Sequence, residues 1–239
     1  MSSNVNAHEN GRMEISLREF YEAEVAQKKF WASSREIILA ENILAELSKS
    51  NSDSDKFLEV GIGDGFLLRQ IRQLGLEVIG VDIAVKRCRV ARINVPDAQI
   101  IVADARFLPF KSETFDIIVC SETLEHVPGY SKAISEARRV LKNFGRYIVT
   151  VPFRQKLHQV LCPHCLRSFY VDGHINSFDE KQLVQLFTSL GFEVQKIHGF
   201  GSQLFYDKNH FRFMRWIVDR ILYKIFNSAT YIMCIGIKK

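Results

Sequence analysis

The chain has 239 residues, of which 47% are hydrophobic and 25% are charged, and its formal net charge at pH 7 is +5. These values are typical of a folded globular protein, and they exclude a wholly disordered chain, a collagen and a membrane bundle. A charge excess this small does not identify a partner. Because the sequence has no long apolar run and its first residues do not resemble a signal peptide, we expect a cytoplasmic protein.

The predicted elements begin after residues 1–13, which are polar, show no periodicity and are expected to be flexible. Helical spacing of apolar residues over 14–50 predicts two helices with a break near 32–34. Beyond the polar linker at 51–55, short apolar runs alternate with amphipathic segments. The runs predict strands at 56–60, 77–81, 99–103, 115–120, 145–151, 192–197 and 230–237, and the segments between them predict helices at 65–74, 84–93, 131–141 and 179–190.

This alternation predicts an α/β fold with a doubly wound sheet and helices on both of its faces. Two stretches depart from the alternation, at 153–177 and 199–229, and we interpret them as insertions. A single domain over 56–239 therefore accounts for most of the chain, with the helical region 14–50 placed before it.

A glycine-rich turn follows the first predicted strand, in the sequence Glu59-Val-Gly61-Ile-Gly63-Asp-Gly65. Glycine accepts positive φ angles and lets a ligand approach the backbone, and a strand-to-helix turn is where ligands bind in this architecture. A dinucleotide fingerprint would need its third glycine at the position of Phe66. The spacing is therefore not that of a dinucleotide site.

The same turn resembles motif I of class I S-adenosylmethionine-dependent methyltransferases of the type 11 group. Further motifs agree in order: Asp82 ends the second strand, Asp104-Ala105 ends the third in a D-A-x-x-L-P-F pattern, and residues 115–127 and 137–145 are similar to the family's later motifs. The resemblance implies a Rossmann-like, seven-stranded sheet whose last strand is antiparallel. It implies S-adenosylmethionine as the cofactor, bound by Glu59, Gly61, Gly63, Gly65, Asp82, Ile83, Asp104, Ala105 and Ser121.

Two side chains after the fourth strand are candidates for acid–base catalysis. Methyl transfer from a sulfonium is an in-line displacement for which alignment supplies much of the acceleration, so a base is optional. Glu122 and His126 lie four residues apart and would share one face if this segment is helical. In the family, however, residues of this segment line the methionine portion of the cofactor, so both roles stay open.

The first helical region carries Phe30-Trp31 followed by Arg35. This arrangement is similar to an element that forms a lid over the cofactor in some members of the family. The alternative is an amphipathic helix with a buried Trp and a solvated Arg.

The first insertion contains a C-x-x-C pair with histidines on both sides. Two thiolates and two imidazoles can form a tetrahedral, structural zinc site, for which the ligands would be His158, Cys162, Cys165 and His174. Some bacterial methyltransferases that resemble this chain carry such an insertion. Packed cysteines, a redox pair and a metal site with fewer ligands are the alternatives.

A basic, aromatic-rich amphipathic helix is predicted within the second insertion, at 211–226. A helix packed on the sheet and a peripheral contact with a membrane surface are both compatible with this pattern. We expect the methyl acceptor to be a small molecule or a lipid-linked compound. The alternatives are an RNA or protein acceptor docked through the zinc loop and basic helix, and a cofactor-binding domain without transfer activity.

Overall fold

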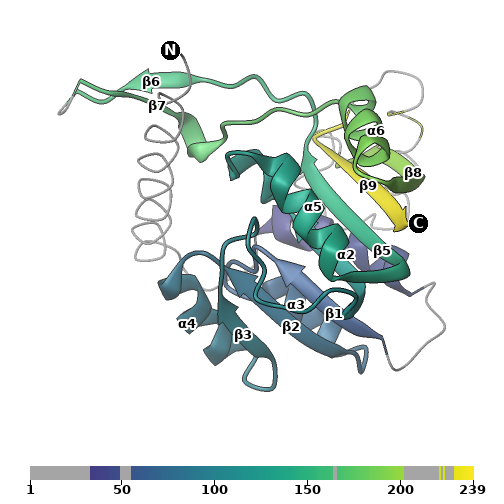
Figure 1. The fold of residues 1–239 in the computed structure, drawn as a ribbon. Coiled ribbons are helices and arrows are strands. Elements are labelled where there is room, and N and C mark those ends of the chain that lie inside the picture. Colours follow the sequence, from purple (N-terminus) through teal and green to yellow (C-terminus); the bar gives the residue numbers. More distant parts are fainter. Residues whose placement is uncertain (1–32, 49–54, 164–165, 202–220, 222, 224–228) are drawn as a thin grey trace, which may run out of the picture.

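The computed structural model describes residues 33–48, 55–163, 166–201, 221, 223 and 229–239. The predicted flexible N-terminus, the Phe30-Trp31 pair, Cys165 and nearly all of the predicted basic helix lie outside these residues. The described part is built around a seven-stranded sheet in the order β3-β2-β1-β4-β5-β9-β8, with helices on both faces (Figure 1).

The strands of this sheet follow the predicted apolar runs. They are β1 (Lys56–Val60), β2 (Glu77–Asp82), β3 (Gln99–Val102), β4 (Phe115–Ser121), β5 (Leu141–Pro152), β8 (Phe192–Phe200) and β9 (Tyr231–Lys238). The first five pair in parallel, whereas β9 lies antiparallel between β5 and β8. The predicted Rossmann-like architecture with an antiparallel last strand is confirmed.

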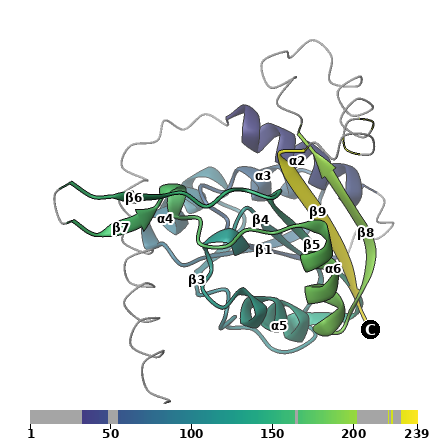
Figure 2. The same ribbon diagram turned by 90° about the horizontal axis from the view of Figure 1, so that it is seen from above.

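The helices lie in two layers, one on each side of the sheet, as Figure 2 shows, and an apolar core lies between each layer and the sheet. Helices α2 (Ser34–Leu47), α3 (Phe66–Arg72) and α4 (Val85–Asn94) cover one face, and α5 (Tyr130–Val140) and α6 (Glu180–Ser189) cover the other. Side chains alternate between the faces along each strand: Phe57 packs in the core beneath α2, α3 and α4, and Leu58 packs in the core beneath α5 and α6. Burial of both faces explains the continuous apolar runs.

Helix α2 begins at the predicted break. The side chain of Ser33 accepts a hydrogen bond from the backbone N–H of Glu36, and Glu36 bonds back to the backbone of Ser33, which forms a capping box. The helix packs Ile38, Leu39, Ile43 and Leu47 against the sheet. Its first turn carries Arg35, which forms an ion pair with Glu122, the residue that follows β4.

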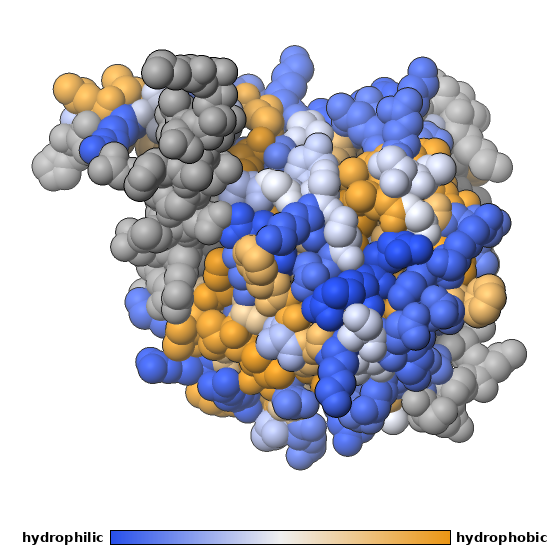
Figure 3. All heavy atoms as spheres, viewed as in Figure 1, coloured by the Kyte–Doolittle hydropathy of each residue, from blue (hydrophilic) through white to orange (hydrophobic). Residues whose placement is uncertain are grey.

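The first insertion, 153–177, contains a two-stranded hairpin that the sequence did not predict. Its strands are β6 (Gln159–Leu161) and β7 (Ser168–Tyr170), followed by the short 3-10 helix η2 (Val171–Gly173). Figures 1 and 2 show the hairpin projecting from the body of the protein, and Figure 3 shows apolar surface where it lies. The hairpin region exposes the large apolar side chains of Val160, Leu161, Leu166, Phe169 and Val171.

None of the helices in the described residues is long and apolar enough to cross a bilayer.

The described cysteines differ in the environment of their thiols, which gives a prediction about reactivity. Burial raises the pKa of Cys88 to about 11 and the pKa values of Cys120 and Cys234 to about 12. Cys162, in contrast, is half-buried. In chelator-treated protein at pH 8, we expect iodoacetamide to label Cys162 quickly and the three buried cysteines only after denaturation, because the thiolate is the reactive form. Peptide mass spectrometry would measure this, and fast native labelling of Cys120 would contradict the packing.

Candidate functional site

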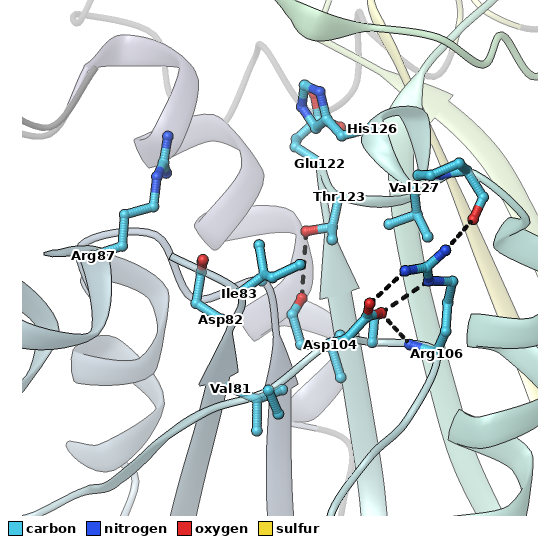
Figure 4. Close-up of a pocket in the computed structure, with 15 residues that line it drawn as sticks. Val81, Asp82, Ile83, Arg87, Asp104, Arg106, Glu122, Thr123, His126 and Val127 are labelled. Atoms are coloured by element: carbon cyan, nitrogen blue, oxygen red, sulfur yellow. Dashed lines mark hydrogen bonds and ion pairs between the residues drawn. The ribbon is translucent and has the colours of Figure 1, made fainter. Parts of the chain in front are cut away.

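A pocket lies at the carboxyl ends of β1, β2, β3 and β4, where the parallel strands open into loops (Figure 4). Ligands bind at this edge in open α/β sheets. The lining combines apolar side chains with charged ones: Val60, Gly61, Val81, Asp82, Ile83, Arg87, Ala103, Asp104, Ala105, Arg106, Glu122, Thr123, His126, Val127 and Pro128.

The glycine turn after β1 brings backbone to the pocket wall at Gly61. Its φ of 82° is in the left-handed region, and a Cβ built there would lie 2.0 Å from Oγ1 of Thr123. The Thr123 hydroxyl is itself held by the backbone carbonyls of Ser121, at 2.9 Å, and Val60, at 3.3 Å. A residue without a side chain is therefore required for Thr123 to stand beside the turn.

Asp82, at the end of β2, points its carboxylate into the loop region beside the turn. It is 8% exposed; its Oδ1 accepts the N–H of Ala84 at 2.8 Å and its Oδ2 accepts the N–H of Gly63 at 3.1 Å. Burial raises the pKa of Asp82 and the backbone donors oppose that rise. Each carboxylate oxygen has a second lone pair, so Asp82 can also accept hydrogen bonds from a ligand.

Asp104 and Arg106 form an ion pair on the pocket wall beyond β3. The Nε and a terminal nitrogen of Arg106 bind both carboxylate oxygens, at 3.0 and 2.5 Å, and a further bond runs to the carbonyl of Pro128 at 3.3 Å. Burial alone would raise the pKa of Asp104, but Arg106 outweighs it and holds the pKa below its ordinary value. Arg106 thus orients the carboxylate and ties two walls of the pocket together.

The sequence-predicted cofactor residues divide into two groups. Gly61, Asp82, Ile83, Asp104 and Ala105 line the pocket directly. The other four lie behind its walls: Gly63 donates to Asp82, Gly65 caps α3, Ser121 shares a hydrogen bond with Thr150 at 2.8 Å, and Glu59 is buried in the sheet.

Glu59 is 3% exposed, and its Oε2 has no hydrogen-bond partner within the described residues. Burial raises its pKa well above the ordinary value, and the charges of Asp64 and Asp82 act in the same direction.

The two predicted catalytic residues lie together at the end of the pocket away from Val81, as Figure 4 shows. Glu122 forms an ion pair with Arg35 of α2. Burial raises the pKa of Glu122 to about 7, although Arg35 opposes the rise. Burial lowers the pKa of His126 to about 3, so His126 is neutral at physiological pH.

The predicted zinc ligands are spread along the insertion. Cys162 lies in the turn of the hairpin, where its backbone bonds to Arg167 and Leu166, and His158 lies just before β6. His174 follows η2 and is 5% exposed, with its ring 4.5 Å from the ring of His126. Cys165 is outside the described residues. Zinc binding by this set stays a prediction.

Several residues of the site were not singled out from the sequence: Arg87, Arg106, Thr123 and Glu125. Each is one residue among many charged or polar ones, and only the tertiary fold distinguishes it. Arg35 was noted as part of a lid element, and its contact with Glu122 spans 87 positions of sequence.

The Arg35–Glu122 pair gives a second prediction. Arg35→Met should lower the free energy of unfolding at pH 8 by about 2 kcal/mol, because it leaves a buried carboxylate without its partner; the figure is below that for fully buried pairs because the Arg35 side chain is 40% exposed. Adding Glu122→Gln should recover at least half of the loss. A double-mutant cycle by urea denaturation measures both, and strictly additive effects would contradict a direct pair.

Comparisons with known proteins agree with this geometry. Residues 58–149 match the family described as a methyltransferase domain. An uncharacterized protein of Methanocaldococcus jannaschii, MJ1123, is 30% identical over 165 residues, which cover 68% of this chain and 76% of that protein. The demethylmenaquinone methyltransferase of Thermotoga maritima is 27% identical over 162 residues, which cover 59% of this chain and 71% of that protein.

Among solved structures, a S-adenosylmethionine-dependent methyltransferase of Methanosarcina mazei superposes with a TM-score of 0.60 at 20% identity. The match covers 81% of this chain and 96% of that chain, and it supports the fold. The matched family domain extends from β1 into β5, and its span contains the whole pocket lining. Residues 58–149 therefore form a methyltransferase domain, and the chain has the fold of a S-adenosylmethionine-dependent methyltransferase.

Proposed function

We propose that the protein transfers a methyl group from S-adenosylmethionine to a small-molecule or lipid-linked acceptor. The observation that carries the proposal is the pocket itself, in which two carboxylates, Asp82 and Asp104, stand at the ends of adjacent parallel strands. Charged acceptors form the stronger hydrogen bonds with hydroxyl and amino groups. Asp82 is suited to a ribose diol and Asp104 to an adenine amino group.

The residues present fit the cofactor. Gly61 places backbone in the pocket wall, and the apolar side chains of Val60, Ile83 and Val127 offer contacts to a base and an aliphatic chain. When bound, S-adenosylmethionine supplies an electrophilic methyl group on a sulfonium. The residues of the chain would orient it by hydrogen bonds and exclude water, and alignment with the acceptor can supply much of the acceleration.

Glu122 and His126 line the end of the pocket away from Val81, and we assign this end to the acceptor. Of the two, Glu122 has the pKa nearer to neutral pH, at about 7, which is the range suited to a general base. His126 has a much lower pKa, so we assign it a positioning role in the proton chemistry.

The hairpin region supports an acceptor with an apolar part. Its exposed side chains, among them Leu161 and Phe169, form an apolar surface. The segment that follows the hairpin is hydrogen-bonded to the backbone carbonyl of Glu125, next to the site. The Thermotoga maritima relative is named for a quinone substrate. The lid role of 14–50 and membrane contact through 211–226 remain further parts of this proposal.

The test is transfer of labelled methyl groups from S-adenosylmethionine into separate fractions of cell extract. We expect label in the organic-solvent fraction, which contains quinones and other lipids. Label confined to RNA or protein, with binding that weakens steeply as salt is added, would replace this proposal by the macromolecular alternative.

A further inference from the structure

Three metal-binding side chains meet beside the acceptor end of the pocket. Glu125 and His126 belong to the 3-10 helix η1 (Leu124–His126), and His174 follows η2 in the insertion. One ligand atom from each lies within 4.8 Å of the others, and Nε2 of His126 is 3.8 Å from Oε1 of Glu125. The two imidazole rings meet edge to face at 4.5 Å between centroids.

Hydrogen bonds set both histidines in the form that binds metal. Nδ1 of His126 lies 3.1 Å from the carbonyl oxygen of Gly173, and Nδ1 of His174 is bonded to the side-chain oxygen of Gln155. A carbonyl oxygen only accepts, so each Nδ1 carries the proton and each Nε2 keeps its lone pair. Metal-binding histidines are held in this way by carbonyl or carboxylate partners on the opposite nitrogen.

The environment of Glu125 supports a cation site independently of the histidine geometry. Its side chain is fully buried, and neither carboxylate oxygen has a hydrogen-bond partner within the described part of the chain. Arg35 forms its hydrogen bond with Glu122 rather than with Glu125. A buried carboxylate without partners is costly unless a cation compensates it.

The two segments that carry the ligands are fixed to each other by backbone bonds. The carbonyl of Glu125 accepts the N–H groups of Ile175 and Asn176, at 2.9 and 3.0 Å. The side chain of Asn176 in turn donates to the carbonyls of Leu124 and Val127, both at 2.9 Å. The site is therefore held together by hydrogen bonds that do not depend on a bound ion.

We infer that Glu125, His126 and His174 bind one divalent transition-metal cation. Two imidazoles and one carboxylate are a donor set typical of zinc, manganese, cobalt or non-haem iron, and three protein ligands leave coordination positions open. His126 also lines the pocket, so a cation with open positions would lie next to the acceptor end. A hydroxyl oxygen of the acceptor is the ligand suited to them; this last step rests on the proposed methyl transfer, whereas cation binding does not.

The inference competes with the zinc site predicted from the sequence for His174. That histidine cannot serve both sets, because its ring is packed against His126.

Co²⁺ distinguishes the two sites, since thiolate ligands produce intense charge-transfer absorption that imidazole and carboxylate ligands do not. Cys162→Ser removes a thiolate of the hairpin, and Glu125→Gln removes the carboxylate of the pocket site with little change in shape.

The experiment is a Co²⁺ titration of the chelator-treated full chain, followed by visible absorption. We expect one equivalent of Co²⁺ to bind without thiolate absorption bands. Binding should be roughly 100-fold weaker in Glu125→Gln. It should be roughly 10- to 100-fold weaker in Gln155→Ala, which removes only the hydrogen bond to Nδ1 of His174. Cys162→Ser should bind within twofold of the original protein. Thermal unfolding confirms that each variant is folded.

Three outcomes would overturn the inference: no stoichiometric Co²⁺ binding, unchanged binding in folded Glu125→Gln, or thiolate bands that disappear in Cys162→Ser. Binding of S-adenosylmethionine is measured on the same samples. If the original protein binds S-adenosylmethionine but no Co²⁺, the result counts against the metal site alone. If it binds Co²⁺ but no S-adenosylmethionine, the result counts against the methyltransferase proposal alone.

Discussion

Asp82→Ala should weaken S-adenosylmethionine binding by a factor of about 100 or more. The carboxylate would accept two hydrogen bonds from the ribose, and bonds to a charged group contribute about 1.5–3 kcal/mol each, so their joint loss exceeds two powers of ten in affinity. The variant also frees the backbone N–H groups of Gly63 and Ala84, which loosens the glycine turn. Equilibrium dialysis with labelled cofactor measures the dissociation constants.

The matched control is Asp97→Ala, which removes an exposed carboxylate outside the pocket lining. Its dissociation constant should stay within twofold of the original value, and both variants should keep the unfolding cooperativity of the original chain. Equal affinities for Asp82→Ala and Asp97→Ala would show that Asp82 does not hold the cofactor.

Gly61→Ala should lower the free energy of unfolding by about 3 kcal/mol. The positive φ of 82° costs a residue with a Cβ about 1–2 kcal/mol, and the added methyl would overlap Thr123, 2.0 Å from its hydroxyl oxygen. Thr123 can move away only by giving up its bonds to the carbonyls of Val60 and Ser121. Urea denaturation gives the loss, and cofactor binding should fall with it because the turn forms one wall of the pocket.

Gly75→Ala separates the two contributions. Gly75 has a similar φ, 86°, but a Cβ there would meet no atom within 4 Å, so only the backbone cost of about 1 kcal/mol applies. The difference of about 2 kcal/mol between the variants measures the contact with Thr123. If the two alanines cost the same, Thr123 does not constrain the turn.

The main sheet could be predicted because its signal is local and repeated. Mostly apolar runs such as 115–120 are typical of strands whose two faces are covered by helices, and their alternation with helical segments predicts a doubly wound sheet. The antiparallel direction of β9 came from the family resemblance rather than from periodicity. The carboxylates Asp82 and Asp104 were predictable because Asp82 ends β2 and Asp104 follows β3 closely, both at the ligand-binding edge.

The contacts between distant segments could not be predicted in the same way. Arg35 reaches Glu122 and Arg106 reaches Pro128 through the fold, and no spacing rule encodes either pairing. For His174, a C-x-x-C pattern nearby favoured a zinc site with the cysteines, whereas the structure packs its ring against His126 beside Glu125. Short strands such as β6 and β7 carry too few residues for a periodic signal.

The most direct test of the methyltransferase account is a crystal structure of the full chain with S-adenosylhomocysteine, the product left after methyl transfer. We expect the ribose hydroxyls within hydrogen-bond distance of Asp82, the adenine beside Asp104, and the sulfur turned toward Glu122 and His126. A well-ordered ligand in which Asp82 makes no ribose contact, or a pocket that stays without ligand at saturating concentration, would contradict the account.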